Sequence, residues 1–482
     1  MSQRLTSFPA HLDDGGQTHR LSRLARLCGF VGTFWLAYYM ASTPVAIMSC
    51  LVVSVSALLV KRSCYIFNLR RGTITAFWYV SYLAMIFFPA FGVYSDQEGP
   101  YRARYLFAVE SVLITVPLGW WAANLWSGFR REEIDRFFES SIEDIVTGRL
   151  LMRRWRLFLV ICLAFTGAYL AEVKAIPLFY LIRNPGEAFQ AAILREESFK
   201  LLDSPLLYFY QLVRVALYPI LILIALGSYL RFRQRRWLVM LMVASISGLF
   251  FASLTLAKAP VALIFLLIGV FLYLYRRGSL SRKTVAIVLV LVFAFPLFVV
   301  IFAFSGGSGE IVTPLAAMVA IGSRLFSIPA EAVYYYFEYF PDQVKYLHGR
   351  SIDKLARVMG VPPFDTANAI GLYAFNSGAD SITANAAFIA DLNADFGMWG
   401  VILGGLLVGV VMQAVQIFIL RRRKTVVTLA CFSFLIIAFW FLQSTSLPVV
   451  LASNGIILTL LLGWYFDRGP LTRVAMPNGS AA

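Results

Sequence analysis

Long apolar runs separated by short polar segments dominate this chain of 482 residues. A membrane-spanning helix needs about 20 mainly apolar residues, and scanning for such runs gives about twelve. They lie near residues 27–43, 45–60, 73–94, 106–125, 157–173, 207–230, 237–256, 259–275, 284–304, 397–420, 425–444 and 447–466. The pattern therefore predicts an all-α polytopic membrane protein with about twelve transmembrane helices.

Two pairs of runs leave the number of crossings open. Pro44 separates 27–43 from 45–60, so these runs form either a hairpin or one long helix. The short LAKAP segment separates 237–256 from 259–275 and leaves the same two alternatives open.

The basic residues concentrate in the segments between alternate runs. If the N terminus lies inside, 29 of the 42 Lys and Arg residues fall in inward-facing segments. This is the positive-inside pattern of membrane proteins, and such basic loops also contact anionic lipid headgroups. The net charge of +16 is therefore a signal of topology, and it does not predict nucleic-acid binding.

Composition agrees with a membrane location. The chain is 60% hydrophobic and only 14% charged, against about 25% charged residues in an ordinary soluble domain. A soluble enzyme is thereby excluded. We expect one membrane domain with a cytoplasmic tail at each end and three long loops, as follows: tail 1–26, membrane domain 27–466, tail 467–482, inner loop 127–156, and outer loops 174–206 and 305–396.

The inner loop 127–156 has an amphipathic pattern. Ile134, Phe137 and Phe138 recur at helical spacing with charged residues between them. We expect this segment to lie along the inner membrane surface, with its apolar face in the headgroup region.

Motifs for metals and cofactors are not found in the sequence. The cysteines and histidines do not have the spacing of a disulfide framework or a metal site, and no Walker loop or GxGxxG motif opens a soluble domain. We therefore expect no metal and no cofactor. The residues concerned are Cys28, Cys50, Cys64, Cys162, Cys431, His11, His19 and His348.

The large outer loop contains the segment IGSRLFSIPAEAVYYYFEYFPDQ, which reads as one helix. Arg324, Ser327, Glu331, Tyr335 and Glu338 follow one another at spacings of three and four, so they share a face of that helix. A helix face with an arginine, carboxylates and a phenol suits a polar pocket. Ion pairing within the helix explains Arg324 and Glu331 equally well.

The loop ends with TANAAFIADLNADFGMWGVILGG, which places Asp391, Asn393 and Asp395 just before a helix expected to begin at Phe396. Acidic residues there are favoured by the helix dipole, and the alternatives are capping by Asn393 or Asp395 and a substrate site. A calcium loop is excluded, because it needs glycine where Phe396 stands and glutamate where Ile402 stands. We expect the glycines that follow to allow close helix packing: Gly397, Gly400, Gly404, Gly405 and Gly409.

Two cations stand at membrane depth. Arg214 lies about 10 Å along the run 207–230, and Lys258 lies in the LAKAP turn. Snorkelling to the interface is one explanation, and a functional site is the other. Together with Arg195, Arg324 and Arg350, they could form an outward-facing cationic cluster, and arginine binds pyrophosphate through two parallel hydrogen bonds.

Three segments together resemble the bacterial O-antigen and exopolysaccharide repeat-unit polymerases of the Wzy type, over roughly residues 160–465. These segments are ASLTLAKAPVALIFLLIGVFLYLYRR, SRLFSIPAEAVYYYFEYFPDQVKYLHGRS and TANAAFIADLNADFGMWGVILGGLLVGVV. The resemblance implies a GT-C-like, metal-independent glycosyltransferase in the bacterial inner membrane. Its substrate would be an undecaprenyl-diphosphate-linked oligosaccharide at the periplasmic face, and its expected partners are a flippase and a chain-length regulator.

Such a reaction requires a carboxylate that takes the proton of an acceptor hydroxyl and cations that stabilise the departing diphosphate. Asp391, which is less needed for capping, and Glu331 are the candidate bases, and Arg324 is the candidate catalytic cation. The expected substrate-binding residues are Arg214, Lys258, Arg350, Arg195, Tyr335, His348, Asn385, Asn393 and Asp395. Asparagine, aspartate and aromatic residues suit sugars, although solvated loops also use them in turns.

Two alternatives remain open from the sequence. An O-antigen ligase would use the same lipid-diphosphate chemistry and would transfer the glycan to a lipid A core. A flippase or secondary transporter should show repeat symmetry and broken helices at the membrane centre, whereas the sequence shows no internal repeat.

Overall fold

The structure is a computed structural model. It describes residues 31–63, 71–144, 148–173, 175–278, 280–304, 313–375 and 383–468, apart from short gaps at 185–186, 188–189, 192, 196–197 and 199–203. The predicted N-terminal tail 1–26, Cys28, Cys64 and the chain after Arg468 lie outside these ranges.

Helices make up all the regular structure of the described residues. The long helices, some of them interrupted, are α2 (Thr43–Ser63), α3–η1–α4 (Ile74–Tyr82, Leu83–Phe87, Phe88–Asp96), α5 (Tyr101–Ser127), α7 (Gly148–Glu172), α10–η2–α11 (Ser204–Leu212, Val213–Leu217, Tyr218–Phe232), α12 (Arg235–Ser253), α13 (Lys258–Tyr275), α14 (Arg282–Phe304), α19 (Phe388–Leu420), α20–η3 (Val426–Trp440, Phe441–Gln443) and α21–α22 (Leu447–Ala452, Ile456–Asp467). The short helices are α6 (Glu132–Glu139), α8 (Pro177–Arg183), α15 (Pro314–Phe326), α16 (Ile328–Tyr339), α17 (Asp353–Val358) and α18 (Thr366–Phe375).

The helix lengths confirm a polytopic membrane protein. Within the described ranges, ten helical segments are long and apolar enough to cross a bilayer, or eleven if the bent pair α15–α16 is counted as one span. The alternatives at 237–275 are resolved, because α12 and α13 each have the length of a separate span. At the N-terminal pair, residues 31–40 are helical and the helix is interrupted at residues 41–42 before α2 begins.

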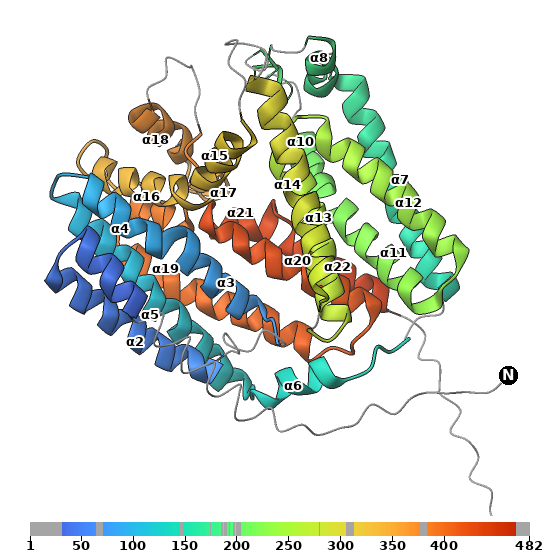
Figure 1. Cartoon of the computed structure of the whole chain (residues 1–482), viewed down its shortest axis with the longest axis horizontal. Helices are drawn as coiled ribbons and strands as arrows, with labels where there is room; N and C mark the ends of the chain where they lie inside the picture. The colour runs from blue at the N-terminus through green and yellow to red at the C-terminus, as the bar shows by residue number, and fades with distance from the viewer. Residues whose placement is uncertain are drawn as a thin grey trace, which may run out of the picture.

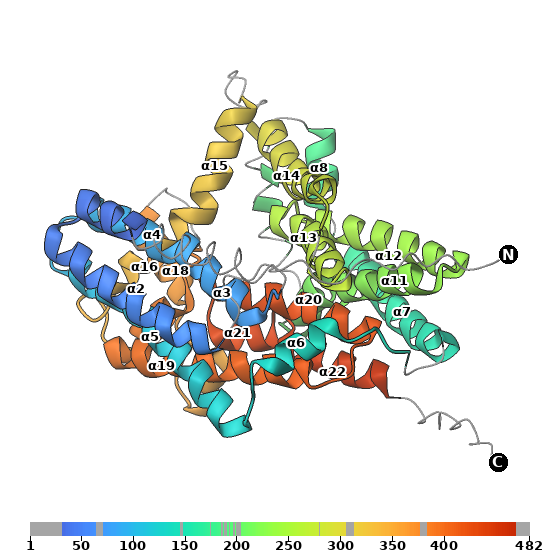
Figure 2. The same cartoon turned by 60° about the horizontal axis from the view of Figure 1, so that its bottom comes forward.

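Helix α20 lies between two groups of helices in both views (Figure 1 and Figure 2). It packs against α3 of the first group, which contains α2–α5 and α19, and against α11 and α13 of the second, which contains α7 and α10–α14. Fourteen of its 15 residues are buried. Its sequence VVTLACFSFLIIAFW is apolar all round, as expected for a helix with protein on every side.

Glycines allow α5 and α19 to approach until their backbones touch. A Cβ atom at Gly409 would lie 2.2 Å from the carbonyl oxygen of Val116, and one at Gly119 would lie 2.3 Å from that of Leu406. Small residues are the usual means of close helix packing in membranes. The packing role expected for Gly409 and Gly405 is therefore confirmed, since a Cβ at Gly405 would meet a side chain of α5.

Helix α6 forms within the amphipathic inner loop, but its apolar face does not lie on the membrane surface. Ile134, Phe137 and Phe138 are all buried, and both phenylalanine rings contact Phe432 of α20 edge-on. The apolar face of α6 is therefore covered by the protein itself, and its location along the inner membrane surface stays a prediction.

Basic residues from two other segments, one before α3 and one after α19, hold α6 against the helix ends. Arg71 pairs with Asp135 at 2.8 Å and Arg421 pairs with Glu133 at 2.9 Å. The hydrogen bond from Arg421 lowers the pKa of Glu133. Lys424 donates to two backbone carbonyls at the end of α6, and burial lowers its pKa to about 8. The acidic residues of α6 thus offset part of the positive charge on this side.

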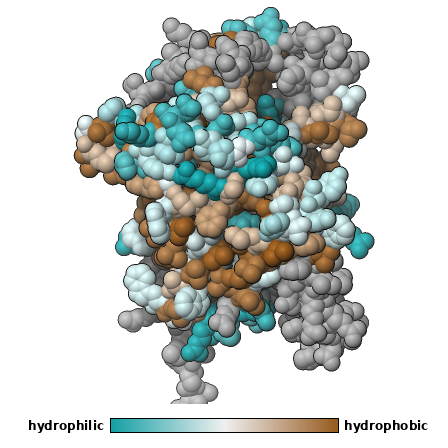
Figure 3. Space-filling model, turned by 90° about the vertical axis from the view of Figure 1, so that its left-hand side faces the viewer, coloured by the Kyte–Doolittle hydropathy of each residue, from teal (hydrophilic) through white to brown (hydrophobic). Residues whose placement is uncertain are grey.

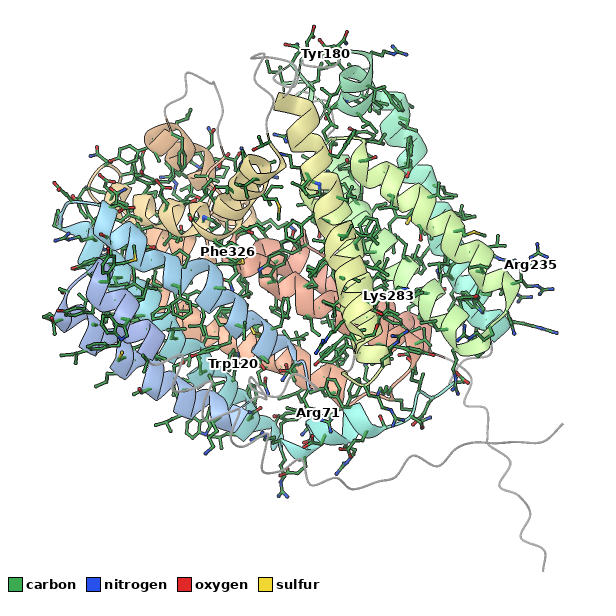
Figure 4. All side chains as sticks on the ribbon, viewed as in Figure 1. Arg71, Trp120, Tyr180, Arg235, Lys283 and Phe326 are labelled. Carbon is green, nitrogen blue, oxygen red and sulfur yellow. The ribbon has the colours of Figure 1, made fainter. Side chains whose placement is uncertain are left out.

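The predicted inward loops meet on one side of the molecule, which we call the basic side. In Figure 4, Arg71 lies toward the lower edge, Arg235 lies at the right-hand edge, and Tyr180 lies at the upper edge. Helices α8, α15 and α18 lie at that upper edge, opposite α6 (Figure 1). We call the side that carries α8 and α15–α18 the loop side, and the predicted outer loops lie there.

An apolar zone crosses the molecular surface between these sides. Figure 3 shows a brown region across the middle of one face, below a teal polar region. Helices α2 and α5 expose Leu51, Leu58 and Leu125 to their surroundings. A large apolar surface of this kind suits contact with lipid chains.

The α5–α19 contact predicts a specific sensitivity. Gly409→Ala should lower the free energy of unfolding by about 1–3 kcal/mol, because the new methyl group overpacks a backbone contact. Thermal unfolding of the detergent-solubilised protein measures this change. Gly167→Ala is the matched control, since a Cβ at Gly167 would meet no atom within 4 Å. Equal melting temperatures for the two variants would contradict the packing described here.

Candidate functional site

Three of the predicted cations gather on the loop side, and we call them the cationic cluster. Arg195 comes from the segment between α8 and α10, Lys258 is the first residue of α13, and Arg324 lies in the last turn of α15. Lys258 lies within Coulombic range of both arginines. The fold therefore brings together three cations that are far apart in the sequence.

The cationic cluster has the charge of an anion site. Arg324 is exposed and Arg195 is half-buried, and none of the ion pairs among the described residues involves Arg195, Lys258 or Arg324. Like charges at short range repel one another. An anionic ligand would remove this repulsion.

Arg214 is buried behind the cluster. Its side chain is only 7% exposed, and its guanidinium donates to Thr255 Oγ1 at 2.9 Å and to Gln211 Oε1 at 2.7 Å. The guanidinium also lies over the ring of Tyr210. Snorkelling is therefore excluded for Arg214. Since Thr255 belongs to the turn that precedes Lys258, Arg214 supports the backbone that carries the cluster.

A proline explains why the helix around Arg214 is irregular. Arg214 lies in η2, a π-helical turn, and Pro219 follows at the start of α11. Proline has no N–H and its ring clashes with the carbonyl four residues earlier, so the hydrogen-bond ladder shifts by one residue. Single π turns of this kind often occur at functional sites.

The predicted helix of the large outer loop is bent. It is divided at Ser327 into α15 and α16, which meet at 43°. Pro329 lies in the first turn of α16, where its missing N–H disrupts the ladder. Phe326 ends α15 between the two groups of helices (Figure 4). The prediction of one continuous helix with Arg324 and Glu331 on the same face is therefore wrong. Arg324 precedes the bend and Glu331 follows it.

Glu331 lines a cavity on the α16 side of the bend. The cavity has a volume of about 290 Å³, and Ser327, Asp96 and Gln97 share its wall with Glu331. Tyr335 donates to Glu331 Oε1 at 3.3 Å. Of the two carboxylates expected to act as a base, Glu331 lines this cavity and Asp391 does not.

Asp391 lies in the first of the two helical segments of α19, before the long helix that follows Gly397. The helix begins at Phe388 and is interrupted at Gly397, whose φ of 62° lies in the left-handed region. Leu392 contacts the positions of Gly400 and Gly404, so the first segment folds back onto the second. Asp391 is half-buried and accepts a hydrogen bond from Thr366 Oγ1 at 2.8 Å.

Asp395 binds the chain's own backbone. Its carboxylate accepts from the amides of Gly349 at 2.9 Å and Ser351 at 3.3 Å, and from the Ser351 hydroxyl. Asn393 is fully buried and donates to the carbonyl of Tyr336. Neither residue caps a helix at Phe396, so that alternative is wrong. Both side chains bind groups of the protein itself, although they were expected to bind substrate.

The remaining predicted residues lie on the loop side in different surroundings. Arg350 is half-buried and donates to the carbonyl of Pro362 at 3.1 Å. His348 and Asn385 are exposed, and His348 has a φ of 53° in the turn that Asp395 holds. Tyr335 lies beside Glu331 and belongs to the cavity's surroundings.

The sequence reasoning missed a carboxylate inside a span. Glu110 of α5 is 4% exposed and accepts a hydrogen bond from Ser49 of α2. Its signal was a single carboxylate within the apolar run 106–125, and such a residue is a functional candidate by default. As for metals, the described residues include no group of three or more His, Cys, Asp or Glu side chains that could hold an ion.

Removing the Asp395 carboxylate should loosen the turn at 349–351. Asp395→Ala leaves two backbone N–H groups without their acceptor, which costs about 1–3 kcal/mol of stability for each buried donor. Limited proteolysis and thermal unfolding of the purified protein report the change. Asn385→Ala, at an exposed position of the same loop, serves as the control and should behave like the wild type. A melting temperature unchanged by Asp395→Ala would refute the anchoring role.

The candidate site therefore consists of the cationic cluster, Arg214 behind it, and Glu331 across the bend. These groups lie on the loop side of a polytopic membrane protein. No protein-family model, no curated protein and no solved structure matches the chain.

Proposed function

We propose that the protein polymerises undecaprenyl-diphosphate-linked oligosaccharide repeat units at the periplasmic face of the bacterial inner membrane, forming O-antigen or exopolysaccharide. The observation that carries this proposal is the cationic cluster. Three segments of the chain each contribute one cation to it on the loop side: Arg195, Lys258 at the start of α13, and Arg324 at the end of α15.

The position of the cluster supports a lipid-linked anion as the ligand. Lys258 begins a span-length helix, so it stands at the level where a bilayer meets water. A lipid diphosphate keeps its chain in the bilayer and its charge at that level. An arginine guanidinium donates two parallel hydrogen bonds to phosphate oxygens. A lysine ammonium adds a compact positive charge beside it.

The loop side faces the periplasm in this proposal. The basic side carries Arg71, Arg231 and Arg421 with their ion pairs, together with the arginines of the adjoining turns. By the positive-inside rule, such a side faces the cytoplasm. The lipid-linked substrate would be delivered by a flippase, and a chain-length regulator is the expected partner for the product.

The reaction is a glycosyl transfer that uses no redox step. The acceptor hydroxyl oxygen bonds to the anomeric carbon of the donor glycan, while the bond between that carbon and the diphosphate oxygen breaks. Glu331 takes the hydroxyl proton, and the lipid diphosphate leaves with the bonding electrons. The cationic cluster stabilises the charge that develops on the leaving diphosphate.

Lipid-linked glycans from cells that lack the gene give the direct test. The proposal requires single lipid-linked repeat units to accumulate and the ladder of polymer lengths to disappear. Accumulation of long lipid-linked chains would instead indicate a ligase or an exporter, and the polymerase proposal would then be abandoned.

Arg324→Ala should reduce polymer formation by about 100-fold or more, because one of the groups that stabilise the leaving diphosphate is removed. Arg324→Lys should retain part of the activity, since it keeps the charge but loses the paired hydrogen bonds. The ladder of polymer lengths in complemented cells measures both. The control is Arg235→Ala, an exposed arginine at the other end of the helices. Normal polymer from Arg324→Ala would remove Arg324 from the site.

Glu331→Gln should reduce polymer formation by about 100-fold to 10,000-fold while the protein still binds the lipid-diphosphate donor, because only the proton acceptor is lost. Asp391→Asn is the matched comparison, since it changes the other candidate base in the same way. Full activity of Glu331→Gln together with loss of activity in Asp391→Asn would assign the base to Asp391.

A further inference from the structure

We propose that the cavity lined by Glu331 binds the terminal sugar of the acceptor glycan and selects a sugar that carries no negative charge. This inference rests on the proposed function. The inference adds a subsite and a substrate class to that function. Two observations support it: the lining of the cavity, and the position of the cavity beside the bend between α15 and α16.

The size and lining of the cavity suit one sugar unit. A volume of about 290 Å³ lies at the lower end of the range for small-molecule pockets. Asp96, Gln97, Ser327 and Glu331 supply hydrogen-bonding groups, while Pro89 and its neighbours on α4 supply an apolar wall. A sugar presents the same combination, with hydroxyl groups at its edge and C–H groups on its face.

The cavity differs from the cationic cluster in charge. Two carboxylates, Asp96 and Glu331, line it, and its lining includes no lysine or arginine. A carboxylate or phosphate on the ligand would be repelled there, whereas hydroxyl or ammonium groups could donate hydrogen bonds to the carboxylates. The cavity thus suits a neutral or amino sugar, and the diphosphate belongs to the cationic cluster.

Helix α16 holds the polar wall in place. Tyr335 donates to Glu331 and also interacts with the side chain of Gln97. The ring of Tyr335 packs edge-on against Phe375 of α18. The Glu331 carboxylate is therefore oriented by a side chain whose own position is fixed by packing.

The bend places the two substrates on either side of one short segment. Arg324 of the cationic cluster stands three residues before Ser327, and Glu331 stands four residues after it. A sugar in the cavity would present a hydroxyl to Glu331. The donor diphosphate at Arg324 would then lie across the 43° bend from it.

Saturation-transfer NMR on the detergent-solubilised full-length protein tests the subsite. The probes are methyl β-glucoside, methyl glucosaminide and methyl glucuronoside at neutral pH. We expect saturation transfer to the neutral sugar and the amino sugar and none to the glucuronoside. Absence of transfer to both of the first two, or equal transfer to the glucuronoside, would overturn the proposal.

Gly92, which lines the cavity on α4, provides a matched pair of variants. A Cβ there would lie 3.6 Å from the Met40 side chain, so Gly92→Ala fits and should keep binding. Gly92→Leu fills the cavity and should abolish saturation transfer to the glucoside. Binding that persists in Gly92→Leu would place the sugar elsewhere and refute the subsite.

Asp96→Asn tests the charge selection without changing the size of the side chain. Saturation transfer to the glucuronoside should appear in this variant, and transfer to the amino sugar should fall. An unchanged preference would overturn the selection by charge. The two proposals can fail separately. If sugar binding follows these predictions while deletion of the gene leaves polymer formation intact, the subsite stands and the polymerase function is rejected.

Discussion

Within a bilayer, every backbone N–H and C=O group must find its partner inside the protein, and this constraint decides where polar chemistry can lie. Helices satisfy it, and in the part of the chain that the structure describes several of them are interrupted close to a proline or a glycine. Arg214 and Glu331 of the candidate site adjoin such interruptions, and so does Asp391, the other candidate base. Arg214 lies in the π turn before Pro219, Glu331 follows Pro329, and the segment with Asp391 folds back at Gly397.

The sequence was sufficient for the features that depend on local pattern. Apolar runs predicted about twelve spans, of which the described residues contain ten or eleven candidates, and the basic loops predicted which helix ends lie together. The start of α19 could not be predicted, because FIADLNADF looks polar enough for a loop and becomes helical through contacts with the turn at 347–351. The burial of the apolar face of α6 could not be predicted either. Phe137 and Phe138 pack against Phe432, which lies almost 300 residues further along the chain.

The candidate site was predictable in its residue types and not in its grouping. Arg195, Arg214, Lys258, Arg324 and Arg350 were expected to form one cluster, and the structure brings Lys258 within electrostatic range of Arg195 and Arg324. Arg350 was expected with them and instead holds the carbonyl of Pro362. An arginine or aspartate in a loop has the same appearance in sequence whether it binds a ligand or a backbone group, and only the tertiary contacts separate the two cases.

The burial of α20 has a consequence for biosynthesis. Its partners α3, α11 and α13 all precede it in the chain, and α22 follows it. The two groups of helices are therefore made and inserted before the helix that joins them exists. Assembly of the complete molecule waits until synthesis has passed Trp440, so a nascent chain stopped earlier carries two membrane-embedded halves without their common centre.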